Sequence, residues 1–451
     1  MRDLILFAII AVSIPLSFFK PYYGILVWTW IAFFNPHRFT WGFMYNAPVA
    51  AVIAIPTLLG CFFTKDINRQ FFKRETLLVV VLWLWYTITL IYAFQVPFFQ
   101  GHTVYAQAEW ERVSKVLLIT LAMILLVTSH ERLKYLIWVT ASSFGLLAIK
   151  GALFGVRTSG EARVFGPPDS FITDNNSFAL AMNMSLPLLF FLARDEKKRT
   201  LRYLLYLAFA CGVLCVILTY SRGGLLGLVV VLLAVTLKSR YKALGVVVLT
   251  VSVFAVLGYA PERWMGRMGG LAHGEIDGSG RQRLVSWGTS WNFVMDYPIT
   301  GGSFNALPDV PIFQRYQPEP LPGGFLSSGP HSIYFQTLEE QGFVGLALYL
   351  ILAMSCWASL LSLRRRAGLL PSTAWIVAYT HMLEIALLGF LVSGAFLGLA
   401  NFDLYYQLIA MVVILKLLFN KYKLERPVTP AKLPEVSEMS ADQLLEEGVA
   451  T

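Results

Sequence analysis

Residues 194–228 read "RDEKKRTLRYLLYLAFACGVLCVILTYSRGGLLGL", and this stretch decides the fold. A strongly basic loop (194–202) precedes an apolar run over 203–220. Arg222 then stands in a turn that leaves almost no loop before the next apolar run. An apolar helix of roughly 20 residues crosses the hydrocarbon core of a bilayer, which is about 30 Å thick. The stretch therefore predicts two membrane helices joined by a tight turn.

The composition extends this pattern to the whole chain. Of 451 residues, 57% are hydrophobic and only 14% are charged, and the mean hydropathy is +0.62. A soluble protein carries about 25% charged residues, so the composition excludes an ordinary soluble enzyme. We predict an all-α polytopic membrane protein with about 12 transmembrane helices and one long periplasmic loop that contains short helices. The predicted spans lie near 4–18, 21–34, 47–63, 76–94, 112–129, 135–154, 176–193, 203–220, 224–237, 243–258, 342–362, 373–397 and 403–419.

The first two spans leave the number of crossings open. Both are short, and Pro15 and Pro21 interrupt them. If they are two separate crossings, the N-terminus lies outside the cytoplasm. If they are one broken span or a shallow hairpin, both chain ends lie inside.

Basic residues gather in alternate loops, and the positive-inside rule places such loops in the cytoplasm. The basic loops are 64–75, 130–134, 194–202, 238–242 and 364–368. The long loop before residue 342 then faces the periplasm or the cell exterior. Because the formal charge of +9 arises largely in these loops, it indicates topology and no nucleic-acid partner. The predicted parts are N-terminal transmembrane helices (1–258), a periplasmic loop subdomain (259–341), C-terminal transmembrane helices (342–420) and a disordered cytoplasmic tail (421–451).

Several arginines are predicted on the periplasmic side. Arg222, at the outer interface, is costly there unless it is paired or functional, so it either extends towards lipid headgroups or binds phosphate. Arg281 and Arg283 begin a predicted helix over 283–298 that ends in the turn "DYPITGG". There they form an anion site or ordinary surface charge. Arg157 and Arg163 either steer an anionic substrate or are simple loop charge.

His331 is the candidate proton acceptor. It follows a Gly-Pro pair and is expected at the first turn of a helix, where the helix dipole opposes protonation. A neutral imidazole there fits a general base, and it fits a helix-capping histidine equally well. The other histidines show no metal-ligand spacing, so we predict no metal site and no cofactor.

Three local motifs occur in order: "SRGGLLGL" (221–228), "GSGRQRLVSW" with "DYPITGGSFN" (278–305), and "HSIYFQTLEEQGFVGL" (331–346). In this order they resemble the O-antigen ligase and polymerase superfamily of bacterial integral-membrane glycosyltransferases. Glu340, Gly342 and Gly345 stand at the matching spacings after His331, while Ser332 replaces an asparagine found in many members. The N-terminal hundred residues resemble the subset of these ligases found beside exosortase-type systems.

The resemblance implies a function. The donor would be a glycan linked to undecaprenyl pyrophosphate, transferred with inversion and without a metal. Arg222, Arg281 and Arg283 would bind the pyrophosphate, His331 would take the acceptor proton, and Glu340 would join the substrate-binding residues. Our prediction is an O-antigen ligase with lipid A-core as acceptor, working among membrane lipids. The alternatives are an O-antigen polymerase, a protein O-oligosaccharyltransferase or, less favoured, a transporter of lipid-linked glycan.

Overall fold

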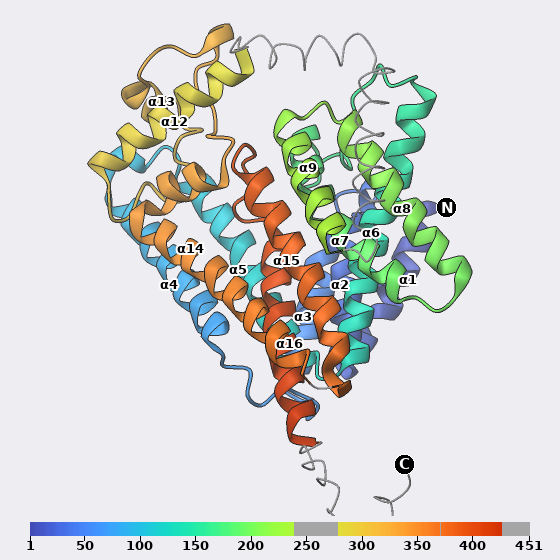
Figure 1. Cartoon of the computed structure of the whole chain (residues 1–451). Coiled ribbons are helices and arrows are strands. Elements are labelled where there is room, and N and C mark those ends of the chain that lie inside the picture. Colours follow the sequence, from blue (N-terminus) through green and yellow to red (C-terminus); the bar gives the residue numbers. More distant parts are fainter. Residues whose placement is uncertain (239–277, 370, 426–451) are drawn as a thin grey trace, which may run out of the picture.

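The computed structural model describes residues 1–238, 278–369 and 371–425 (Figure 1). Two predictions fall outside these residues: the span near 243–258, and the tail from residue 426 onwards. The first part of the predicted loop subdomain, 259–277, also lies outside them. Within the described residues the chain forms helices and turns and no strand. The predicted all-α class is therefore confirmed.

Eight of the described helices are long and apolar enough to cross a membrane, and three more are apolar but shorter. This confirms a polytopic membrane protein. These eight helices are α1 (Arg2–Phe19), α4 (Arg74–Gln95), α6 (His130–Arg157), α7 (Asn175–Asp195), α8 (Arg199–Leu218), α14 (Ile333–Ala367), α15 (Ala374–Gly394) and α16 (Asp403–Glu425). Helix α5 (Thr103–Leu126) is equally long but is not among the eight, because it carries more charged residues. The shorter apolar helices are α2 (Pro21–Phe34), α3 (Val49–Cys61) and α9 (Arg222–Leu237).

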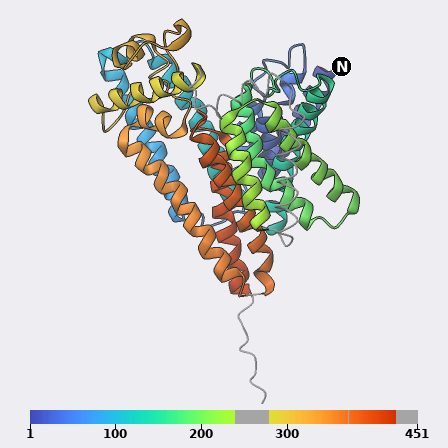
Figure 2. The same cartoon turned by 45° about the horizontal axis from the view of Figure 1, so that its top comes forward.

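The bundle has two distinct ends (Figures 1 and 2). At one end, here called the cap end, lie α12 (Gly278–Asp296) and α13 (Val310–Tyr316). At the opposite tail end α16 ends, and the basic loops meet there. Arg132 pairs with Asp66, and Lys134 pairs with Asp195 across 3.4 Å. The described loops that we predicted on one side of the membrane thus gather at one end of the molecule, while residues 239–242 of the remaining basic loop lie outside the described residues.

Helices α1 and α2 are two separate antiparallel helices. The backbone turns at Lys20, and Ser17 of α1 lies against Gly24 of α2, where an added Cβ would meet the Ser17 Cβ at 2.9 Å. At the other end of α1, Asp3 accepts hydrogen bonds from the amides of Gly42 and Met44, beyond α2. The N-terminus therefore lies at the cap end, which agrees with the reading of two crossings over that of one broken span.

Small residues hold the centre of the bundle together. Helix α7 is buried along most of its length and packs against α15, α8, α9 and α6. The amide of Asn183 donates to the carbonyl of Gly224 on α9 and to the hydroxyl of Ser393 on α15, at 2.8 and 3.0 Å. A Cβ at Gly227 would stand 1.9 Å from the same hydroxyl. Such glycines permit close helix contact in a membrane, where small residues replace the hydrophobic driving force.

The cap has a core of its own. Phe293 of α12 and Phe313 of α13 are fully buried against Phe99, in the short connection between α4 and α5. Below this core the turn after α12 locks onto α14. The amide of Gly302 donates to the carbonyl of Glu339, and the amide of Phe343 donates to that of Pro298. Helix α14 kinks between these two bonds, at Gly342, and its part beyond the kink corresponds to the span predicted near 342–362.

Several helices are longer than the predicted spans. Helix α5 begins at Thr103, ahead of the span predicted near 112–129, because its first turns are polar and are stabilised by ion pairs. Arg112 there bonds Glu109 at 2.7 Å and Asp403 of α16 at 3.1 Å. Hydropathy detects only the apolar part of such a helix, so the predicted boundary falls inside it.

Candidate functional site

Arg222 is the first residue of α9, and the helix end is held firmly. The hydroxyl of Ser221 caps the helix by accepting from the amide of Gly224. Gly223 lies so close to the loop 395–402 that a Cβ would stand 2.8 Å from the Cβ of Phe396. Tyr220, just before the cap, has a φ of 60° and donates from its hydroxyl to the carbonyl of Gly160. The glycines of "SRGGLLGL" thus place Arg222 at the cap end, against the loop that follows α15.

His331 precedes α14 and does not belong to it. The helix begins at Ile333 with Ser332 as its N-cap, so the expectation that His331 lies in the first helical turn is wrong. Its φ of 47° is in the left-handed region, which costs a residue with a Cβ roughly 1–2 kcal/mol. Non-glycine residues in this region cluster at functional sites, where the surrounding structure imposes the strain. Here the indole N–H of Trp287 donates to the carbonyl of Pro330 at 2.7 Å and fixes the preceding residue.

Arg283 faces His331 from α12. Arg283 and Trp287 are four residues apart and share a face of that helix. The indole of Trp287 stacks on Phe335 of α14 at 5.1 Å and lies 6.3 Å from the ring of Phe396. An added Cβ at Gly398 would in turn stand 3.4 Å from the Cα of His331. The loop 395–402 is therefore the surface on which α9, α12 and the start of α14 meet.

The surroundings of His331 favour the neutral imidazole. Desolvation lowers the pKa of His331 from its ordinary value of about 6.5, and the Arg283 charge lowers it further. The carboxylate of Asp174, the N-cap of α7, opposes this by raising the pKa. The shift has the direction that the sequence predicts, but its causes are desolvation and an arginine, not the helix dipole. The residue as a whole is still exposed, so the atoms that desolvate the ring leave it open to an acceptor.

The other predicted cations have contacts of their own, and none of them is a charge that acts on His331. Arg281 is exposed and makes a two-pronged pair with Glu319, with both N–O distances at 3.0 Å. Arg157 is exposed at the end of α6. Arg163 lies 6.0 Å from the ring of Tyr220 and lines a cavity of about 210 Å³ together with Lys150 and mostly apolar side chains.

Glu340 lies inside the protein. Only 2% of its surface is exposed, and its carboxylate accepts from the amide of Asn305 at 3.3 Å and from the side chain of Gln336 at 3.2 Å. The side-chain oxygen of Gln336 accepts in turn from the amide of Ala400. Glu340 therefore supports the loop 395–402 from the interior, through Gln336. Its carboxylate is not accessible to a ligand in this structure.

Two contributors to the site, Phe396 and Gly398, carry little signal in the sequence, whereas a third, Trp287, carries more. Trp287 belongs to a recognisable motif, and its spacing from Arg283 indicates a shared helix face. Phe396 and Gly398 lie in a short uncharged loop, and nothing in the sequence connects them to residues 65 positions earlier or more. Among the residues that the structure describes, no three His, Cys, Asp or Glu side chains gather as a metal site would require.

Fold and site together define a polytopic, all-helical membrane protein with a cationic, histidine-centred site beside a helical cap. Residues 207–350 match the family model of O-antigen ligase. Residues 207–350 therefore carry a domain of the O-antigen ligase and polymerase superfamily, as the motifs predicted. Residues 1–197 match a family described as one of unknown function. A search of curated proteins gave no match.

This domain supports a function of the ligase and polymerase type, a family whose general substrates are a lipid-linked glycan and a lipid acceptor. The exosortase-associated subset stays a prediction.

Proposed function

We propose that the chain is an O-antigen ligase that moves a glycan from undecaprenyl pyrophosphate to lipid A-core at the periplasmic face of the inner membrane. The observation that carries this proposal is that the loop 395–402 contacts Gly223, next to Arg222, and the backbone of His331, on whose imidazole the Arg283 charge acts. A guanidinium pair suits a pyrophosphate, and a neutral imidazole suits a hydroxyl acceptor. The basic loops at the tail end support a cytoplasmic location for that end, and hence a periplasmic site.

In the proposed reaction, His331 takes the proton of the acceptor hydroxyl, and the oxygen attacks the anomeric carbon of the donor. The bond between that carbon and the phosphate oxygen breaks, and undecaprenyl pyrophosphate leaves with the electron pair. Attack from the side opposite the leaving group inverts the anomeric centre. Arg222 and Arg283 stabilise the departing pyrophosphate through charge-assisted hydrogen bonds. Arg157 and Arg163 attract the anionic donor. Arg281 joins the clamp only when it releases Glu319.

The test is transfer by purified protein in detergent, with lipid-linked glycan and lipid A-core as substrates. His331→Gly is the cleanest variant because it removes the imidazole and also relieves the left-handed backbone. We expect transfer to fall by about 10²–10⁴-fold, the usual contribution of a positioned base, while the protein stays folded. His331→Ala should lose as much. Normal turnover by both folded variants would remove His331 from the mechanism.

Arg222→Lys tests the clamp. An ammonium keeps the charge but cannot reproduce the planar two-pronged contact, so we expect a severe loss of transfer. Normal turnover would reduce the role of Arg222 to simple charge. Offering a repeat-unit lipid and a Ser/Thr peptide beside lipid A-core separates the ligase from the polymerase and the protein O-oligosaccharyltransferase. Because detergent removes the membrane barrier, any glycan transfer also excludes a pure transporter.

A further inference from the structure

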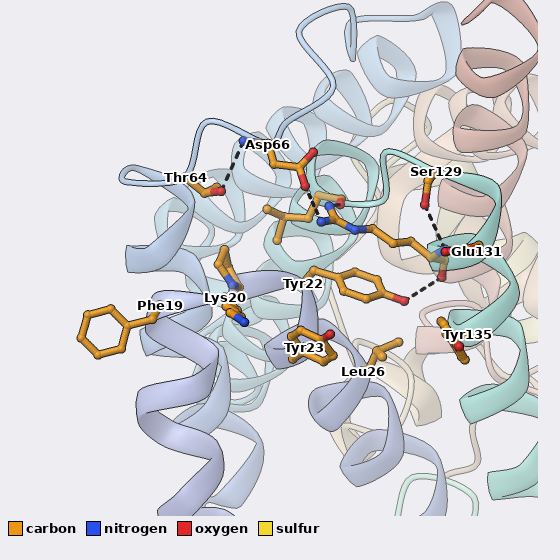
Figure 3. A pocket seen from close by; sticks show the side chains of 13 residues that line it. Phe19, Lys20, Tyr22, Tyr23, Leu26, Thr64, Asp66, Ser129, Glu131 and Tyr135 are labelled. Atoms are coloured by element: carbon orange, nitrogen blue, oxygen red, sulfur yellow. Dashed lines mark hydrogen bonds and ion pairs between the residues drawn. The ribbon is translucent and has the colours of Figure 1, made fainter. Parts of the chain in front are cut away.

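A pocket whose lining does not include His331 lies at the tail end. Figure 3 shows its lining side chains. Its volume is about 660 Å³. It lies where α1 turns into α2, between the loop after α3 and the first turns of α6. Its charged lining residues are Lys20, Asp66, Glu131 and Arg132, and its aromatic ones are Phe19, Tyr22, Tyr23 and Tyr135.

The side chains of one wall of this pocket are held by contacts within the protein. Arg132 pairs with Asp66, and its guanidinium also donates to the carbonyl of Leu126 at 2.8 Å and to the hydroxyl of Thr128 at 3.1 Å. The same guanidinium lies 4.8 Å from the ring centroid of Tyr22, whose hydroxyl donates to the carbonyl of Arg132. Arg132 and Asp66 compensate each other's charges, so this wall of the pocket is polar but has no net charge.

The other two charged residues of the pocket, Lys20 and Glu131, are not paired with each other or with a described neighbour. Within the described part of the chain, neither Lys20 nor Glu131 makes a side-chain hydrogen bond or ion pair, and both are exposed. The ring of Tyr22 lies between them in the view of Figure 3. The pocket thus offers one available cation and one available anion, and its total formal charge is zero. A ligand with one charge of each sign satisfies both, whereas a purely anionic ligand leaves Glu131 uncompensated.

The surroundings indicate a lipid. Phe19, Tyr23 and Tyr135 are exposed on membrane helices beside the pocket. Tyrosine rings are enriched at the depth of lipid headgroups, and their faces attract ammonium groups. The exposed rings and the adjoining lipid-facing surfaces of α1 and α6 leave room for acyl chains along the helices.

We propose that this pocket binds the headgroup of a zwitterionic aminophospholipid from the leaflet at the tail end. Lys20 contacts the phosphate, and Glu131 with the tyrosine rings holds the primary ammonium. This site is separate from the proposed glycosyl transfer and does not depend on it.

The experiment measures binding of phosphatidylethanolamine to the full chain in detergent, by native mass spectrometry and by the shift in thermal midpoint. Phosphatidylglycerol tests for a purely anionic ligand, and phosphatidylcholine tests the need for the ammonium protons. Free phosphoethanolamine tests the headgroup without its chains. We expect phosphatidylethanolamine to bind best and to raise the midpoint most.

Lys20→Ala and Glu131→Gln should each weaken phosphatidylethanolamine binding by about tenfold, since each removes a charge-assisted contact. Lys20→Arg keeps the cation and should retain binding. Lys65→Ala is the matched control, because Lys65 is an exposed lysine of the neighbouring loop that does not line the pocket.

Equal binding of all three phospholipids would overturn the proposal, as would equal losses in Lys20→Ala and Lys65→Ala. Preferential binding of phosphatidylglycerol would overturn it too, because a zwitterion site cannot favour a ligand without an ammonium.

Discussion

At the scale of single residues, the chemistry depends on where His331 is held. Its backbone has a left-handed φ, which is strained for a residue with a Cβ. The residues that follow it begin α14, and Trp287 holds the carbonyl of Pro330 before it. Two charges of opposite sign act on its ring, Arg283 from α12 and Asp174 from the start of α7. Because these charges come from different helices, each can be changed without touching the imidazole.

The pH dependence of transfer follows from this arrangement. A base works only when it is neutral, so activity is present above the pKa of His331 and is lost as the pH falls through it. On the acidic side of the pH profile, here called the acidic limb, the rate falls as His331 is protonated. Because desolvation and Arg283 lower the pKa of His331, the midpoint of this limb should lie below about pH 6.5. Arg283→Gln removes a charge that lowers the pKa, so its limb should move to higher pH. The measurement is the rate of transfer against pH, each variant scaled to its own maximum.

Two further variants serve as controls on that shift. Asp174→Asn removes a charge that raises the pKa, so its limb should move to lower pH, and asparagine is an equally good helix cap. Arg281→Gln should leave the limb in place, because Arg281 is paired with Glu319. A limb that moves the same way in all three variants would contradict the proposed electrostatics.

At the scale of elements, the turn 297–302 and the kink of α14 form one interlocked joint. Gly342 has a φ of 65° and a ψ of −172°, which only glycine adopts readily. An added Cβ would stand 2.1 Å from the carbonyl oxygen of Ile299. The motifs "DYPITGG" and "EEQG" are therefore recognisable because their backbones fit each other, and the fit fixes the cap relative to the start of α14.

Gly342→Ala should break this joint. Backbone strain and the clash with Ile299 together should lower the free energy of unfolding by more than about 3 kcal/mol. Chemical unfolding in mixed micelles measures the change. Gly278→Ala is the matched control, since nothing lies within 4 Å of its added Cβ. If the two variants were equally stable, the joint would have no part in holding the cap.

At the scale of the whole molecule, buried ion pairs tie helices together at the tail end, far from the cap. Glu75 of α4 is completely buried and accepts from Lys416 of α16 at 2.6 Å and from Ser359 of α14, also at 2.6 Å. Three helices that are distant in sequence therefore share one carboxylate. The tail end is held by polar contacts of this kind, while the centre is held by close packing of small residues.

Lys416→Met should be strongly destabilising because it leaves the Glu75 charge buried without its lysine. Breaking a buried pair in this way costs about 3–5 kcal/mol. The double variant with Glu75→Gln should recover much of that loss, since no uncompensated charge remains. Lys115→Met, which breaks the exposed pair with Glu111, should change stability by less than about 1 kcal/mol. A double variant no more stable than Lys416→Met would show that the pair is not the source of the effect.

Most of the fold could be predicted because a membrane imposes a simple rule on the chain. Each crossing needs a long apolar run, and the basic loops mark alternate ends, so both can be read locally. The boundaries of α5 and α14 could not be predicted, because their polar first turns are stabilised by distant partners. The antiparallel arrangement of α1 and α2 also needed the structure, since Asp3 of α1 accepts from Gly42, which lies in the turn beyond α2.

The sequence by itself determined the class of protein, the family motifs, and the residue types of the site: arginines and a histidine on one predicted side. Only the tertiary structure decided which of them meet. It brought Gly223, Trp287 and the backbone of His331 to the uncharged loop 395–402. It also paired Arg281 with Glu319 and buried Glu340. The physical reason is that hydropathy and charge are properties of single segments, whereas convergence depends on how helices far apart in the chain pack against one another.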